Sequence, residues 1–149
     1  MSRLSKLALC LGFVLLLSAK GGKHSVWLVV SNSSPDNQPV DIHFGIVGRA
    51  EETVVSSEHT IAPGTQQLPE QKVREGVYQA LITANGDKVS ALQPFTLDAD
   101  RWILVNYIRE DSLSIVKTYG WVDTTRFKKI GDKYATINIS VDSRRPAGL

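Results

Sequence analysis

The sequence predicts an all-β protein, an antiparallel β-sandwich of about eight strands with an immunoglobulin-like or prealbumin-like architecture. Three observations indicate this fold class. Apolar residues alternate with polar residues in several short runs, turn-forming residues separate these runs, and helical spacing extends over no useful length of the chain.

The alternation is clearest between residues 40 and 46, where every second residue is apolar. A strand with one buried face has this pattern. The residues from Arg101 to Ile108 are largely apolar on both faces, which suits a central strand buried on both sides or a strand that wraps the core. Similar runs predict the remaining strands at Ser25 to Val30, Thr53 to Ile61, Val77 to Ala84, Val89 to Leu97, Leu113 to Trp121 and Tyr134 to Val141.

The segments between these runs contain residues that preset or tolerate turn dihedrals. Asn85-Gly86 is the strongest of these signals, because both residues accept the positive φ of a tight hairpin turn. The other predicted turns are Ser34-Pro35-Asp36-Asn37, Ala62-Pro63-Gly64, Arg109-Glu110-Asp111-Ser112 and Gly131-Asp132.

The first 22 residues have the pattern of a signal peptide. Arg3 and Lys6 precede an apolar run from Leu7 to Ala19, and small and polar residues follow. The run of about 13 residues is shorter than the roughly 20 needed to cross a bilayer as a helix, which predicts cleavage and no remaining transmembrane span. We therefore expect a periplasmic or secreted protein with one β-sandwich domain over residues 23–143 and a flexible tail over residues 144–149.

Composition narrows the possible chemistry of the exported chain. The single cysteine, Cys10, lies in the apolar run, so a processed chain has no disulfide, thiolate metal site or cysteine nucleophile. The formal net charge of the whole chain is +2. Loss of Arg3 and Lys6 leaves it nearly neutral, so there is no global electrostatic case for nucleic acid.

Two segments carry a resemblance to a known group of domains. The run Ser31-Asn32-Ser33-Ser34-Pro35-Asp36, followed by Pro39-Val40-Asp41-Ile42 and Gly45, resembles the opening hairpin of bacterial extracytoplasmic β-sandwich domains of unknown function. Val73-Arg74-Glu75-Gly76-Val77-Tyr78 resembles the Gly-x-Tyr strand start of that family and of prealbumin-like sandwiches. The resemblance implies a fold, and it carries no catalytic residues.

Aromatic residues suggest where a partner binds. Tyr119 and Trp121 are two apart on a predicted strand, so they would share a face about 6.6 Å from each other, a spacing that suits stacking on sugar units or contact with a partner chain. Trp102 and Tyr107 fall on opposite faces of their strand, so at least one is expected in the core.

The C-terminal third is locally basic. Arg126-Phe127-Lys128-Lys129 suits an anionic envelope surface or an acidic glycan, with Phe127 as an apolar anchor. With the aromatics, the candidate contact residues are Trp102, Tyr119, Trp121, Arg126, Lys128 and Lys129.

The leading prediction is therefore a non-enzymatic exported module, without a cofactor, that binds an envelope or extracellular protein or polysaccharide. The sequence has no strained nucleophile motif and no phosphate-binding glycine loop.

The alternative is a small secreted hydrolase or metal-dependent enzyme. Asp41 and His43 share a strand face, and His59 would join them through strand pairing. A third possibility is an assembly subunit whose exposed edge strand pairs with a partner.

Overall fold

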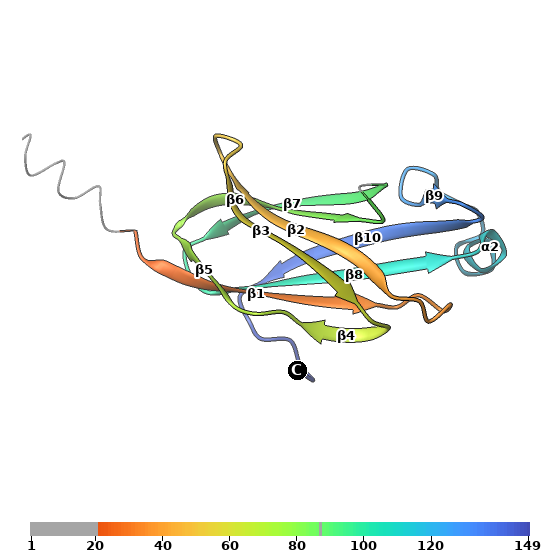
Figure 1. The fold of residues 1–149 in the computed structure, drawn as a ribbon, viewed down its shortest axis with the longest axis horizontal. Helices are drawn as coiled ribbons and strands as arrows, with labels where there is room; N and C mark the ends of the chain where they lie inside the picture. Colours follow the sequence, from red (N-terminus) through yellow and green to blue (C-terminus); the bar gives the residue numbers. More distant parts are fainter. Residues whose placement is uncertain (1–20, 87) are drawn as a thin grey trace, which may run out of the picture.

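A computed structural model describes residues 21–86 and 88–149 as two β-sheets packed face to face (Figure 1). The predicted all-β sandwich is confirmed, and the described residues form ten strands and one short helix. Almost all of the predicted signal peptide lies outside the described residues. No helix in the described part of the chain has the length and apolar character of a membrane span.

Sheet A has six strands, and β1 and β8 lie at its centre. They pair in parallel, whereas the other strand pairs in both sheets are antiparallel. Parallel neighbours need a long connection that returns the chain to the same end of the sheet. The segment from β2 to β7 forms that connection between β1 and β8. The strands of sheet A are β1 (Lys23–Asn32), β4 (Gly64–Gln67), β5 (Gln71–Arg74), β8 (Arg101–Glu110), β9 (Lys128–Ile130) and β10 (Lys133–Asp142).

Sheet B has four strands in the order β3-β2-β6-β7. They are β2 (Val40–Gly48), β3 (Thr53–Ile61), β6 (Gly76–Ala84) and β7 (Val89–Leu97). The predicted turn between β6 and β7 is confirmed, since Asn85 and Gly86 have φ values of 55° and 62°. The remaining long strands also match their predictions to within two residues at each end.

The core lies between the sheets and consists of the inward-facing apolar residues of both. Its fully buried large side chains include Phe44, Ile42, Ile46, Ile82, Leu97, Ile103 and Tyr107. Strand β8 is central in sheet A, and its inner face is buried. On its outer face Trp102 is buried, and Leu104, Asn106 and Ile108 are half-buried. Tyr107 lies in the core, and Trp102 is buried on the outer face of sheet A, so the expectation that at least one of them is buried is confirmed.

The strand predicted at Leu113 to Trp121 is wrong, because this segment forms helix α2 (Ser112–Tyr119). Asp111 caps its start by accepting a hydrogen bond from the backbone N–H of Ser114 (2.7 Å). Gly120 ends it in the left-handed region at φ 83°, with its N–H donating to the carbonyl of Val116 (2.8 Å). Both capping residues are visible in the sequence, but the apolar alternation favoured a strand.

The sequence analysis missed three short strands, β4, β5 and β9. Each has only three or four residues, and few of their side chains are buried, so there is little hydrophobic alternation to detect. Strands β4 and β5 pair with successive parts of β1, and β9 pairs with β10. They extend sheet A without adding much to the core.

Candidate functional site at the α2 end

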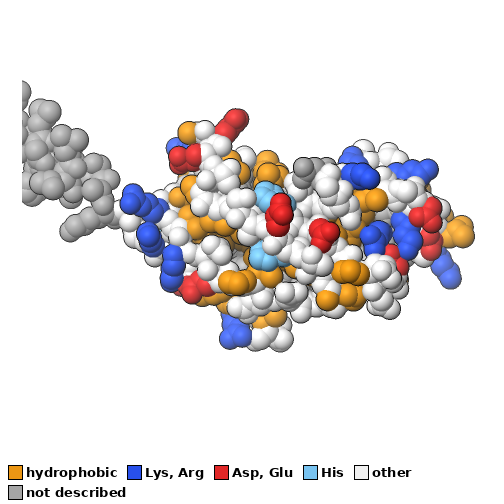
Figure 2. All heavy atoms as spheres, in the orientation of Figure 1, with side chains coloured by type: hydrophobic (Ala, Val, Ile, Leu, Met, Phe, Trp, Pro, Cys, Tyr) orange, Lys and Arg blue, Asp and Glu red, His pale blue; other side chains and the backbone are white. Residues whose placement is uncertain are grey.

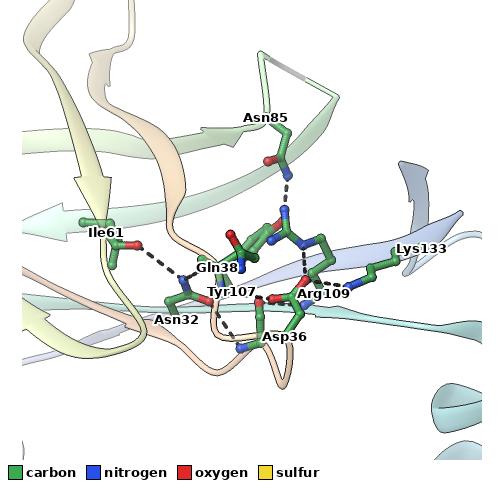
Figure 3. Close-up of polar contacts among 9 residues, drawn as sticks. Asn32, Asp36, Gln38, Ile61, Asn85, Tyr107, Arg109 and Lys133 are labelled. Carbon is green, nitrogen blue, oxygen red and sulfur yellow. Dashed lines mark hydrogen bonds and ion pairs between the residues drawn. The ribbon is translucent and has the colours of Figure 1, made fainter. Parts of the chain in front are cut away.

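An ionic cluster fastens the loop between β1 and β2 to the end of sheet A (Figure 3). The Asp36 carboxylate accepts hydrogen bonds from Arg109 Nε (2.9 Å) and Lys133 Nζ (2.8 Å). Burial raises the pKa of Asp36, but the bonds from Arg109, Lys133 and the Gln38 backbone outweigh this effect and lower the pKa to about 2. Asp36 therefore remains ionised at neutral pH.

Asn32 at the end of β1 and Ser34 in the loop complete this clasp, which we define as Asn32, Ser34, Asp36, Arg109 and Lys133. Buried Asn32 donates to the carbonyls of Gln38 (2.8 Å) and Ile61 (3.3 Å), and its Oδ1 accepts from the Ser34 N–H (3.2 Å). Ser34 Oγ accepts from the backbone N–H of Arg109 (3.1 Å). The clasp thus gives a structural role to the Asn-Ser-Ser-Pro-Asp segment.

The clasp is joined to sheet B through Tyr107. Asn85 Nδ2, in the turn between β6 and β7, donates to the Tyr107 hydroxyl (2.7 Å), as Figure 3 shows. Tyr107 is fully buried and lies two residues before Arg109 on β8. The end of β8 is therefore tied to both sheets immediately before helix α2 begins.

Helix α2 presents most of its apolar side chains to solvent. Leu113 is 80% exposed, Val116 44% and Tyr119 43%, and only Ile115 is buried. Trp121, just after the helix, is 64% exposed. Figure 1 places α2 at one end of the long axis, and Figure 2 shows a hydrophobic side chain protruding at that end among charged groups.

Phe127 packs beneath this surface and is 2% exposed. Its ring centroid is 5.6 Å from that of Tyr119, and the Arg126 guanidinium lies 5.4 Å from the Tyr119 centroid and 5.6 Å from the Phe127 centroid. The prediction that Phe127 is an apolar anchor for a partner is wrong, because its side chain is covered. It instead holds the loop after α2 against the helix.

Positive charge is concentrated between residues 112 and 130. This segment contains four exposed cationic side chains, Lys117, Arg126, Lys128 and Lys129, against the single carboxylate of Asp123. Hydrogen bonds from the Thr125 side chain (2.6 Å) and backbone (2.9 Å) lower the pKa of Asp123. We call the exposed apolar and cationic residues the α2 tip: Leu113, Val116, Lys117, Tyr119, Trp121, Arg126, Lys128 and Lys129.

Five of the six predicted contact residues lie between residues 119 and 129, in or just after α2, and the sixth is far from them. Trp102 is 8% exposed and stacks on Trp27, with ring centroids 4.6 Å apart. It lies near the start of β8, about 27 Å along the strand from Glu110. The predicted strand-face pairing of Tyr119 and Trp121 is also wrong, because one ends the helix and left-handed Gly120 follows it.

Leu113 and Val116 were not predicted as contact residues. Both residues fall in the strand predicted at Leu113 to Trp121, where side chains three positions apart would point to opposite faces. The cap residues Asp111 and Gly120, nine positions apart, are the signal that indicates a helix here.

Asp41, His43 and His59 all line one hollow of the molecule, but their side chains are not grouped as metal ligands. Asp41 Oδ1 accepts from Thr60 Oγ1 (2.6 Å), and His43 Nε2 shares a 2.8 Å hydrogen bond with Ser56 Oγ. His59 pairs with buried Ile42, so strand alternation directs its side chain toward the opposite face of sheet B. Within residues 21–86 and 88–149, no three His, Cys, Asp or Glu side chains are placed to hold a metal ion.

The fold and this site define an all-β sandwich with an apolar, cationic surface at one end. Comparison of the sequence with protein-family models and with curated proteins finds no match.

Proposed function

We propose that this protein is an exported, non-enzymatic module that binds an envelope or extracellular partner through the α2 tip. The observation that carries the proposal is the exposure of Leu113 and Trp121, at 80% and 64%. Large apolar side chains clustered on a surface contribute little to folding, and such patches typically mark interaction sites. Trp and Tyr are also enriched among the residues that dominate binding energy.

The support beneath the tip favours binding. Arg126, Phe127 and Tyr119 pack against one another, and the clasp holds the end of β8, after which α2 begins. A surface held in place before binding loses less conformational entropy when a partner docks. The tip is therefore exposed and supported, which is the combination that a binding site needs.

A pull-down from an envelope or secreted extract tests this proposal, with the chain purified as the host exports it. The test variant is Leu113→Ser/Trp121→Ser. The matched control is Leu92→Ser, because Leu92 is 53% exposed on the outer face of sheet B, away from α2. We expect a partner that the wild type and the control retain and the tip variant loses. Equal retention by all three proteins, with unchanged circular dichroism, would overturn the assignment of the tip.

A second candidate function is assembly by strand addition at β3. Among the described strands, the sheet edges at β4, β5 and β9 are short, and edge strand β7 contains Pro94. Strand β3 has nine residues with no proline or lysine, which leaves a backbone edge suited to pairing. Sedimentation over a concentration series tests this, and Val54→Lys should abolish any association. A monomer at every concentration would exclude self-assembly at this edge.

A further inference from the structure

We propose that the partner of the α2 tip is an anionic lipid surface, and that Leu113, Val116 and Trp121 insert into its interface. The proposal rests on the binding function assigned to the tip above and names the class of its partner. Three properties of the tip carry it: shape, the kind of apolar groups, and charge.

The tip is convex. Helix α2 lies at one end of the long axis (Figure 1), and a hydrophobic side chain protrudes at that end (Figure 2). Leu113 and Val116 of this helix are exposed. Among the described residues, one hollow lies beside β2 and β3, and another lies over β1, β8 and β10 beside the C-terminal residues. No residue of the tip lines either of them. Small ligands and sugars usually bind in concave sites, whereas a protruding apolar end can enter the soft boundary of a bilayer.

The apolar groups are of two kinds that partition together at membrane interfaces. Leu113 and Val116 are aliphatic, and they supply hydrocarbon surface without the flat faces that stack on sugars. Tyr119 and Trp121 are amphipathic aromatics, which prefer the headgroup region of a bilayer. The mixture favours a lipid interface over a polysaccharide.

The charge of the tip complements an anionic surface. Residues 112–130 contain four exposed cations and one carboxylate, which accepts a hydrogen bond from Thr125. Lys128 and Lys129 are neighbours on β9 and point to opposite faces, so Lys117 and Arg126 with one of these two lysines can meet the same surface. Lys117 is four positions after Leu113, so it shares a helix face with the residue that protrudes most. Glu110, Asp111 and Asp132 flank this segment, which predicts moderate affinity with a clear dependence on salt.

Cosedimentation with vesicles tests the proposal, using the chain as the host exports it. One set of vesicles is phosphatidylcholine, and the other is phosphatidylcholine mixed with phosphatidylglycerol. We expect at least about tenfold tighter binding to the anionic vesicles, and at least a tenfold loss of that binding in Leu113→Ser/Trp121→Ser. Leu92→Ser should bind as the wild type does. All proteins share the same N terminus, so any lipid affinity of that end is common to them.

Tryptophan emission gives a second readout. Trp27 and Trp102 are stacked on each other, whereas Trp121 is exposed. Insertion should therefore shift the emission to shorter wavelength, and Trp121→Phe should remove the shift while most binding remains. A shift that persists in Trp121→Phe would contradict insertion of the tip.

The possible outcomes distinguish lipid recognition by the α2 tip from the more general proposal that the tip binds a partner. Equal binding of wild type and tip variant to anionic vesicles would overturn lipid recognition by the tip. A protein or glycan that is lost from the tip variant in the pull-down, with no vesicle binding, would also overturn it but would leave the binding function intact. If neither assay responds to the tip variant, both proposals fail.

Discussion

Trp102 and Trp121 lie in two regions of the molecule that differ in how far they expose a tryptophan side chain. Trp102 is 8% exposed, with Trp27 stacked on its ring and Arg145 of the C-terminal tail 5.9 Å from its centroid. Trp121 is 64% exposed at the α2 tip. The comparison shows that a tryptophan is buried where neighbouring chain covers it and stays exposed to solvent where none does.

The largest effect on stability should come from removing the buried ring of Trp102. Trp102→Ala is expected to lower the free energy of unfolding by about 3 kcal/mol, because it deletes a buried aromatic and its stack with Trp27. Urea denaturation followed by circular dichroism measures this change. A loss of less than about 1 kcal/mol would mean that the two tryptophan regions differ less than their exposure indicates.

Breaking the clasp should have the next largest effect. Asp36→Asn is expected to cost about 1 to 2 kcal/mol, because Arg109 and Lys133 lose their shared carboxylate. The pKa of Asp36 is lowered from 3.8 to about 2, so the folded state binds its proton less readily than the unfolded state does. Its contribution is therefore complete above about pH 5 and is lost as the pH falls through 4 toward 2.

Urea midpoints of the wild type and Asp36→Asn across this pH range measure that contribution. The difference between the two proteins should shrink as the medium becomes acidic. A constant difference from pH 7 to pH 2 would show that the ionised carboxylate is not the stabilising group.

A smaller effect is expected at the end of α2. Gly120→Ala should cost about 1 kcal/mol, because residue 120 has φ 83° and a side chain there is strained. A Cβ at this position would meet nothing within 4 Å, so the cost arises from the backbone alone. Thermal unfolding measures the loss. Gly120→Asn is the matched control and should recover part of it, because asparagine tolerates this conformation better.

The smallest effect on stability should come from the exposed ring. Trp121→Ala is expected to change the free energy of unfolding by less than about 0.5 kcal/mol, because its side chain is mostly in solvent. Urea denaturation beside Trp102→Ala gives the direct comparison. A loss of 2 kcal/mol or more would assign Trp121 to the fold and remove the central support for the α2 tip.

Local patterns in the sequence were sufficient for most of the sandwich. Strand β3 was predicted at its observed ends, and the Asn85-Gly86 turn has the expected positive φ. Alternation and turn chemistry act between close neighbours in the chain, so a single sequence displays them. The helix at Ser112–Tyr119 was missed because Leu113, Ile115, Tyr119 and Trp121 fall on alternate positions, as the apolar residues of a strand do.

The candidate site could be predicted only in part. The basic residues and Trp121 were recognised from their types, but Trp102 was grouped with them although about 27 Å of strand lies between it and Glu110. Phe127 was expected on the surface and is buried. These errors share one cause, since exposure depends on elements that are distant in the sequence and meet only in the folded chain.

The sequence by itself determined the period-two strands, the turns between them and the location of basic and aromatic residues along the chain. Only the tertiary structure decided that Asp36 pairs with Arg109 and Lys133, which lie 73 and 97 residues away. It also decided that Trp102 is covered and Trp121 is not. The physical reason is that backbone preference is local, whereas burial and charge pairing are set by whichever segments the fold brings alongside.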